Sequence, residues 1–111
     1  MNINTSQRCG FPNQLSVAMD GSVDLVGTLL HNPVCITFKN QSADTVSLSV
    51  NDPTGANVWD TFVAGEVFTL DCRNQHGLAA NFTMDIGTSF YASGTNGSGN
   101  FVIAYVYALG T

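Results

Sequence analysis

The residues of this chain that could do chemistry are few, and their spacing is unfavourable for a metal site. Cys9, Cys35 and Cys72 are far apart in the sequence, whereas structural zinc sites usually carry a Cys-x2-Cys pair. His31 lies close to a turn proline and His76 precedes a glycine, so both are expected in loops. The spacing therefore predicts no zinc site.

Catalytic arrangements are equally poorly represented. A nucleophilic enzyme needs a nucleophile, a base and an orienting group, and there is no Gly-x-Ser-x-Gly elbow, so a small hydrolase is disfavoured. Glu66 is the only glutamate, and the aspartates are scattered without an EF-hand loop, although a surface calcium site between loops stays open. The glycine-rich segment 94–99 lacks the Lys-Ser/Thr ending of a phosphate-binding loop. We expect no enzymatic activity and no cofactor.

Aromatic side chains are the remaining candidates for ligand binding. Small β-sandwiches often bind sugars through exposed aromatic rings, and Trp59, Tyr91, Tyr105 and Tyr107 are the residues of this kind that could do so. A single tryptophan in a small sandwich is more often a core residue. A carbohydrate-binding or host-adhesion module is therefore the alternative hypothesis.

Composition and charge narrow the classes of partner. The net charge is −5, and Arg8, Lys39 and Arg73 are the only basic side chains. Nucleic acid and anionic membranes both need clustered cations, so neither is an expected partner. The segment 1–8 is polar and unlike a signal peptide, and no apolar stretch reaches the length of a membrane span, so we expect synthesis in a reducing cytosol with three free thiols.

The sequence predicts a series of short strands separated by turns. Segments 34–39 and 45–50 alternate between apolar and polar residues, as strands of a sheet wetted on one face do. In segment 67–72, the inward side chains are expected to be Phe68, Leu70 and Cys72. Further strands are predicted at 15–19, 23–30, 58–63, 89–92 and 101–109, with a strand or loop at 78–84 and a hairpin loop at 93–100.

These patterns predict one all-β domain. The fold class is a single antiparallel β-sandwich or jelly-roll-like barrel of about seven to eight short strands. Residues 1–13 are predicted to form an extended N-terminal arm, and residues 14–111 the sandwich domain.

The last strand differs from the others because both of its faces are apolar. One face carries Phe101, Ile103, Tyr105 and Tyr107; the other carries Val102, Ala104, Val106 and Ala108. A second apolar face needs a cover, which is either the chain's own arm or loop, or another subunit. The residues predicted to form a subunit interface are Phe101, Ile103, Tyr105 and Tyr107, together with Arg8 and Phe11 of the arm.

Several features carry a resemblance to a known type of protein. They are the polar turn and alternating strand over 40–48, the Ala64-Gly65-Glu66 turn into Phe68-Thr69-Leu70, the strand and loop over 89–95, and the apolar final strand. In these the segment 37–109 resembles small β-sandwich virion proteins of tailed bacteriophages, including capsid decoration (cement) proteins and head-fibre modules. The resemblance implies a homo-oligomer, a trimer above all, that binds between major capsid proteins on the capsid surface of the virion and is made in the host cytoplasm.

Overall fold

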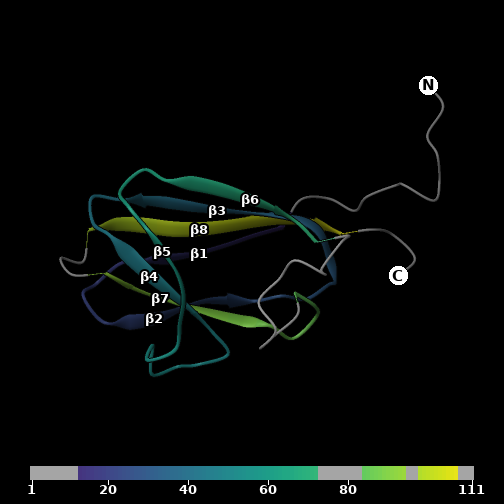
Figure 1. The fold of residues 1–111 in the computed structure, drawn as a ribbon, viewed down its shortest axis with the longest axis horizontal. Helices are drawn as coiled ribbons and strands as arrows, with labels where there is room; N and C mark the ends of the chain where they lie inside the picture. The colour runs from purple at the N-terminus through teal and green to yellow at the C-terminus, as the bar shows by residue number, and fades with distance from the viewer. Residues whose placement is uncertain (1–12, 73–83, 95–97, 108–111) are drawn as a thin grey trace.

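The computed structural model describes residues 13–72, 84–94 and 98–107, and these residues form eight strands and no helix (Figure 1). The strands are β1 (Asn13–Ala18), β2 (Val23–Thr28), β3 (Pro33–Ser42), β4 (Val46–Val50), β5 (Val58–Phe62), β6 (Val67–Asp71), β7 (Ser89–Gly94) and β8 (Gly99–Tyr107). Each predicted strand that falls in the described residues is present, within a few residues of the predicted bounds. Most of the segment 78–84 lies outside the described residues.

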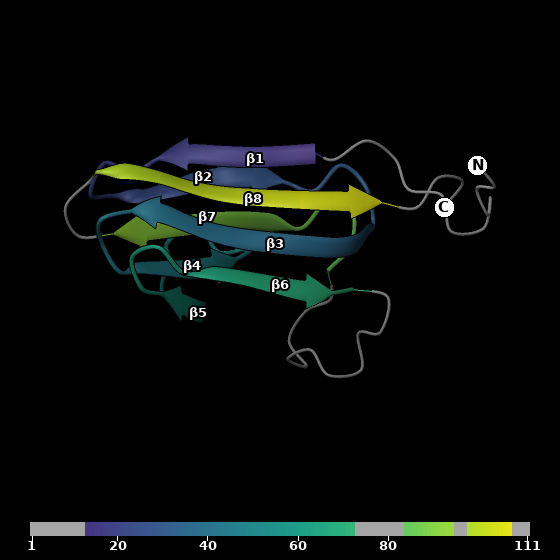
Figure 2. The ribbon, with the colours of Figure 1, turned by 90° about the horizontal axis from the view of Figure 1, so that it is seen from above.

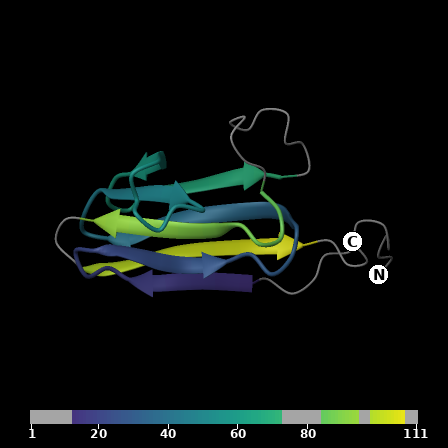
Figure 3. The same ribbon diagram turned by 90° about the horizontal axis from the view of Figure 1, so that it is seen from below.

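The strands form two four-stranded antiparallel sheets that pack face to face. The order is β1-β8-β3-β6 in one sheet, which Figure 2 views from outside, and β2-β7-β4-β5 in the other, which Figure 3 views from its own side. Hydrogen-bonded pairs are nested along the chain: β4 with β5, β3 with β6, β2 with β7 and β1 with β8. This nesting is the jelly-roll arrangement of the β-sandwich, so the predicted fold class is confirmed.

Alternation along the strands explains the core. Ile36 and Phe38 of β3 are fully buried, as are Val46 and Leu48 of β4, because these side chains point into the space between the sheets. The buried apolar cluster comprises Met19, Val26, Leu29, Ile36, Phe38, Val46, Leu48, Phe62, Cys72, Met84, Phe90, Ala92, Phe101, Ile103 and Tyr105. Phe38 lies at its centre, with ring centroids 5.8 Å from Phe62 and 5.6 Å from Phe90.

Two local predictions are corrected. Segment 93–100 is not a hairpin loop, because β7 and β8 belong to different sheets and the connection crosses between them. Asn13, predicted as the last residue of the arm, pairs with Tyr105 as the first residue of β1. Phe68 points inward as predicted, and it remains 37% exposed because β6 is an edge strand. Residues 1–12 lie outside the described residues.

A buried asparagine joins the turns at one end of the sandwich. The Asn40 side chain donates from Nδ2 to the carbonyl oxygens of Asp44, Phe62 and Val63, at 2.7, 2.9 and 3.0 Å. Its Oδ1 accepts from the backbone N–H and the hydroxyl of Ser42, at 3.0 and 2.6 Å. One side chain therefore connects the β3–β4 turn to the end of β5, across the two sheets.

Candidate contact surface

The outer face of the β1-β8-β3-β6 sheet, which we call the β8 face, is the candidate contact surface. Its side chains form four rows across the strands, set by the pairing register. The rows are Ala18, Asn100 and Gln41; then Ser16, Val102, Lys39 and Val67; then Gln14, Ala104, Thr37 and Thr69; then Val106, Cys35 and Asp71. Most of these side chains are small or apolar, and the central strand contributes Val102, which is only 5% exposed, and the half-buried Ala104 and Val106.

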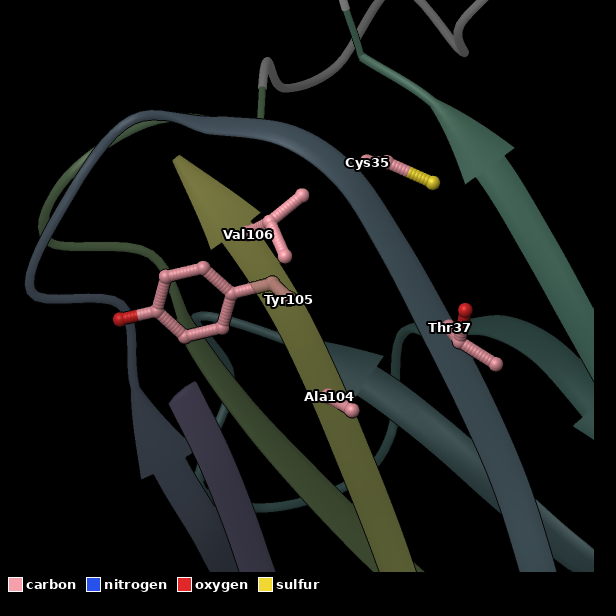
Figure 4. Close-up of a pocket in the computed structure, with 5 residues that line it drawn as sticks. All are labelled: Cys35, Thr37, Ala104, Tyr105 and Val106. Atoms are coloured by element: carbon pink, nitrogen blue, oxygen red, sulfur yellow. The ribbon is translucent and has the colours of Figure 1, made fainter. Parts of the chain in front are cut away.

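A shallow hollow lies at the centre of the β8 face. Its volume is about 140 Å³, and it is lined by Cys35, Thr37, Ala104, Tyr105 and Val106. Figure 4 shows the ring of Tyr105 directed away from the other four side chains, so the second apolar face of β8 forms the hollow. The hollow exists because Ala104 is the smallest side chain of its row and leaves space between its longer neighbours.

The residues predicted to form an interface lie elsewhere. Phe101 and Ile103 are 0% exposed and Tyr105 is 2% exposed, so all three fill the sandwich's own core. This corrects their assignment to a partner surface. Both faces of β8 are apolar, and only the packing of the second sheet decides which one faces inward. The predicted contact residues Arg8 and Phe11 lie outside the described residues.

Tyr107 and the end of β8 pack against the β2–β3 connection. The rings of Tyr107 and His31 stack in parallel, with centroids 3.7 Å apart and planes 3° apart. The hydroxyl of Tyr105 accepts a hydrogen bond from the backbone N–H of Leu30 at 3.1 Å. Tyr107 is half-buried by this stack, and His31 therefore has a packing role.

Charge is distributed unevenly over the molecule. All eight carboxylates fall within the described residues, and the register places only Asp71 on the β8 face. Lys39, the one basic side chain that the described residues contain, lies on the same face. The β8 face is therefore close to neutral on an acidic protein, which lowers the electrostatic cost of bringing another protein against it.

The two described cysteines occupy different environments, and both are free thiols. Cys35 is half-buried at the hollow, whereas Cys72 is buried in the core, 3% exposed. Burial, with smaller effects of Cys35 and Asp71, raises the pKa of the Cys72 thiol to about 12. Cys72 is thus an inert apolar core residue rather than a nucleophile. Cys9 lies outside the described residues.

Carboxylates gather as a pair at the β1–β2 turn. The Asp20 carboxylate accepts hydrogen bonds from the Ser22 hydroxyl and backbone N–H, which together with a hydrogen bond to Asp24 lower its pKa. The same shared hydrogen bond, and then desolvation, raise the pKa of Asp24. Over residues 13–72, 84–94 and 98–107, no three His, Cys, Asp or Glu side chains gather in a group that could hold a metal ion.

The aromatic residues considered for sugar binding are mostly engaged in packing. Trp59 is half-buried against Phe38, with ring centroids 5.2 Å apart. Tyr91 is half-buried on β7, and its cross-strand neighbours are Leu25 and Ser49. Carbohydrate binding stays a prediction.

Comparison with known proteins found no matching family model, no matching curated protein and no matching solved structure. A search of the described part of the chain for a helix long and apolar enough to cross a membrane found none. The function must therefore be argued from the geometry of the chain itself.

Proposed function

We propose that this chain is a non-catalytic structural protein that works by contact, as a capsid decoration (cement) protein does. The observation that carries the proposal is the β8 face, with its apolar side chains and central hollow, on the nearly neutral side of an acidic protein. Val102 is already buried, so the apolar surface left for a partner is that of the half-buried Ala104 and Val106 and of Val67, which is 61% exposed; exposed apolar area of this kind favours burial against another protein.

The size of the β8 face fits a contact that acts in many copies. Four strands about 4.8 Å apart and the nine residues of β8 at about 3.4 Å each give an area of roughly 600 Å². Stable interfaces bury about 800 Å² on each partner, so a single contact would be weak. A shell that presents many equivalent sites compensates, because linked contacts bind with far higher avidity than one alone.

The virion assignment has separate support. It rests on the resemblance of segment 37–109 to small phage virion proteins, and on the recurrence of jelly rolls in viral capsid proteins. Jelly rolls also occur in lectins and in enzymes, so the fold contributes only an analogy. The partner of the β8 face would then be a coat subunit, with an apolar side chain filling the hollow. The hollow is shallow and open, so with a volume of about 140 Å³ it offers room for part of one apolar side chain.

The test is incorporation into particles. Virions would be purified from an infected culture that produces the chain, and the chain quantified by mass spectrometry in wild-type and Ala104→Glu forms. The wild type should be present in fixed stoichiometry and Ala104→Glu strongly depleted, because a carboxylate in the hollow would be buried without a partner. Thr61→Glu, on exposed β5 of the other sheet, is the control and should be retained. Absence of the wild-type chain from the particles would reject the proposal.

A further inference from the structure

The outer edge of β6 pairs with no strand of the residues that the structure describes. Its other edge pairs with β3 (Figure 2). Val67 is 61% exposed, and the inward-pointing Phe68 is 37% exposed. Edge strands are normally protected by short length, charged residues, proline or a bulge. β6 has no lysine or proline, and its protection is limited to its length of five residues and the single charge of Asp71. Its apolar inner side is left incompletely covered.

The hydrogen bonds at the two ends of the β3–β6 pair reveal which backbone groups face outward. The Asn40 N–H donates to the Glu66 carbonyl at 2.9 Å, and the Cys72 N–H donates to the Val34 carbonyl at 2.9 Å. The Glu66 carbonyl and the Cys72 N–H therefore both point toward β3, and along an antiparallel strand the residues whose backbone groups face one neighbour alternate with those whose groups face away from it.

Alternation from those ends makes Thr37 and Thr69 a non-hydrogen-bonded pair. Their hydroxyl oxygens lie 3.0 Å apart, as the closer spacing of side chains at such positions allows. The backbone N–H and C=O groups of Thr69 and Val67 consequently point away from β3, toward the free edge. They are in place to pair with an added strand.

We propose that the added strand is β6 of a second copy of this chain, antiparallel and centred on Thr69. In this register Thr69 pairs with the partner's Thr69, and Val67 pairs with the partner's Asp71. Phe68 then lies beside the partner's Leu70, and each covers apolar surface that the single chain leaves incompletely buried. The two sheets become one sheet of eight strands, with β6 of each copy at its middle.

The charges fit this register. Val67 is directly across from Lys39 within one copy, so the partner's Asp71 enters the same row as Lys39, on the same face of the joined sheet. The two-fold symmetry repeats this lysine–aspartate relation at the other end of β6. In a symmetric dimer each copy places its own carboxylate in the row of the partner's lysine. A strand from another protein would have a carboxylate there only by coincidence, which favours a second copy as the occupant.

The pairing through β6 does not depend on the proposed function, and it predicts a different oligomeric state. A two-fold contact gives a dimer, whereas the resemblance to decoration proteins implies a trimer. The contact through β6 also leaves the outer side of β8 uncovered.

Sedimentation equilibrium of the purified full chain across a wide concentration range tests the pairing. The wild type should fit a monomer–dimer equilibrium. Thr69→Lys and Thr69→Glu each place like charges opposite one another at the two-fold axis, and each should weaken the dimer at least about tenfold. An equal mixture of the two variants should restore a dimer, because lysine then faces glutamate. Thr61→Lys, on edge strand β5 of the other sheet, is the matched control and should behave as wild type.

Each alternative outcome is decisive. A wild-type chain that is monomeric at all concentrations, or trimeric, overturns the proposal. A dimer that persists in both single variants shows that Thr69 does not lie at the axis, and the same is shown if the mixture fails to restore the dimer. Circular dichroism spectra identical to wild type establish that the exposed Thr69 variants have folded.

Discussion

Removing the Asn40 side chain should be among the most damaging substitutions in this protein. Asn40 is 1% exposed, and its side chain makes five polar contacts with Ser42, Asp44, Phe62 and Val63. Nδ2 has only two hydrogens for three acceptors, so about four net hydrogen bonds are lost in Asn40→Ala. At about 1 kcal/mol each, the expected loss is about 4 kcal/mol, from a total stability of about 5–15 kcal/mol.

Urea unfolding followed by fluorescence measures this loss, because Trp59 is the only tryptophan and packs against Phe38 in the core. Gln41→Ala is the matched control: it removes the same kind of amide from the next residue of β3, which is exposed, and should change stability by less than about 0.5 kcal/mol. A loss below about 1 kcal/mol for Asn40→Ala would refute the argument that this one side chain holds the turns together.

Three further predictions concern backbone strain and pH. Gly99→Ala should lower the free energy of unfolding by more than about 3 kcal/mol, because φ is +84° and the added Cβ would lie 2.6 Å from the Gln41 carbonyl oxygen. Gly65→Ala, where φ is +81° and the added Cβ meets open space, should cost about 1 kcal/mol. Equal losses of stability in thermal unfolding would contradict this. The buried Cys72 thiol of the native protein should resist brief maleimide labelling at pH 8. Because folding raises the pKa of this thiol from 9.0 to about 12, the unfolded chain loses the proton first, and the free energy of unfolding should fall as the pH rises from 9 toward 12. Cys72→Ala should reduce this fall. Hydrogen bonds from the Thr54 hydroxyl, then from the N–H groups of Asn57 and Thr54, lower the pKa of Asp52 below 3.8. The ionised Asp52 should therefore stabilise the fold above that pH, and this contribution should be lost in more acidic solution. Unfolding measured as a function of acid pH should show a smaller loss of stability in Asp52→Asn.

The two faces of β8 can be tested separately. If the β8 face is a contact surface, substitutions on it should weaken binding and leave the protein folded. Substitutions on the inner side of β8 should instead lower the stability of the fold. Ile103→Ala, in the core, and Ala104→Glu, at the hollow, are adjacent residues that make this comparison within one strand.

The sequence alone determined the class of fold and most of its strands. Low charge, abundant turn residues and strict alternation over 34–39 and 45–50 are local properties, and a strand needs only such properties to be recognised. The sequence Asp52-Pro53-Thr54-Gly55 is typical of a turn, and the Gly55 N–H donates to the Asp52 carbonyl at 3.2 Å, with Gly55 at φ +74°.

Only the tertiary structure decided which strands are neighbours and which face of β8 points inward. Both faces of β8 are apolar, so alternation could not distinguish the inward side chains of Phe101, Ile103 and Tyr105 from the outward side chains of Val102, Ala104 and Val106, of which Val102 is itself only 5% exposed. Nested pairing of strands distant along the chain, the crossing between sheets after β7 and the exposed edge at Phe68 are long-range results. The same holds for Asn40, which looks like an ordinary turn residue until the end of β5 packs against it, because a buried polar group is recognisable only from the partners that the fold brings to it.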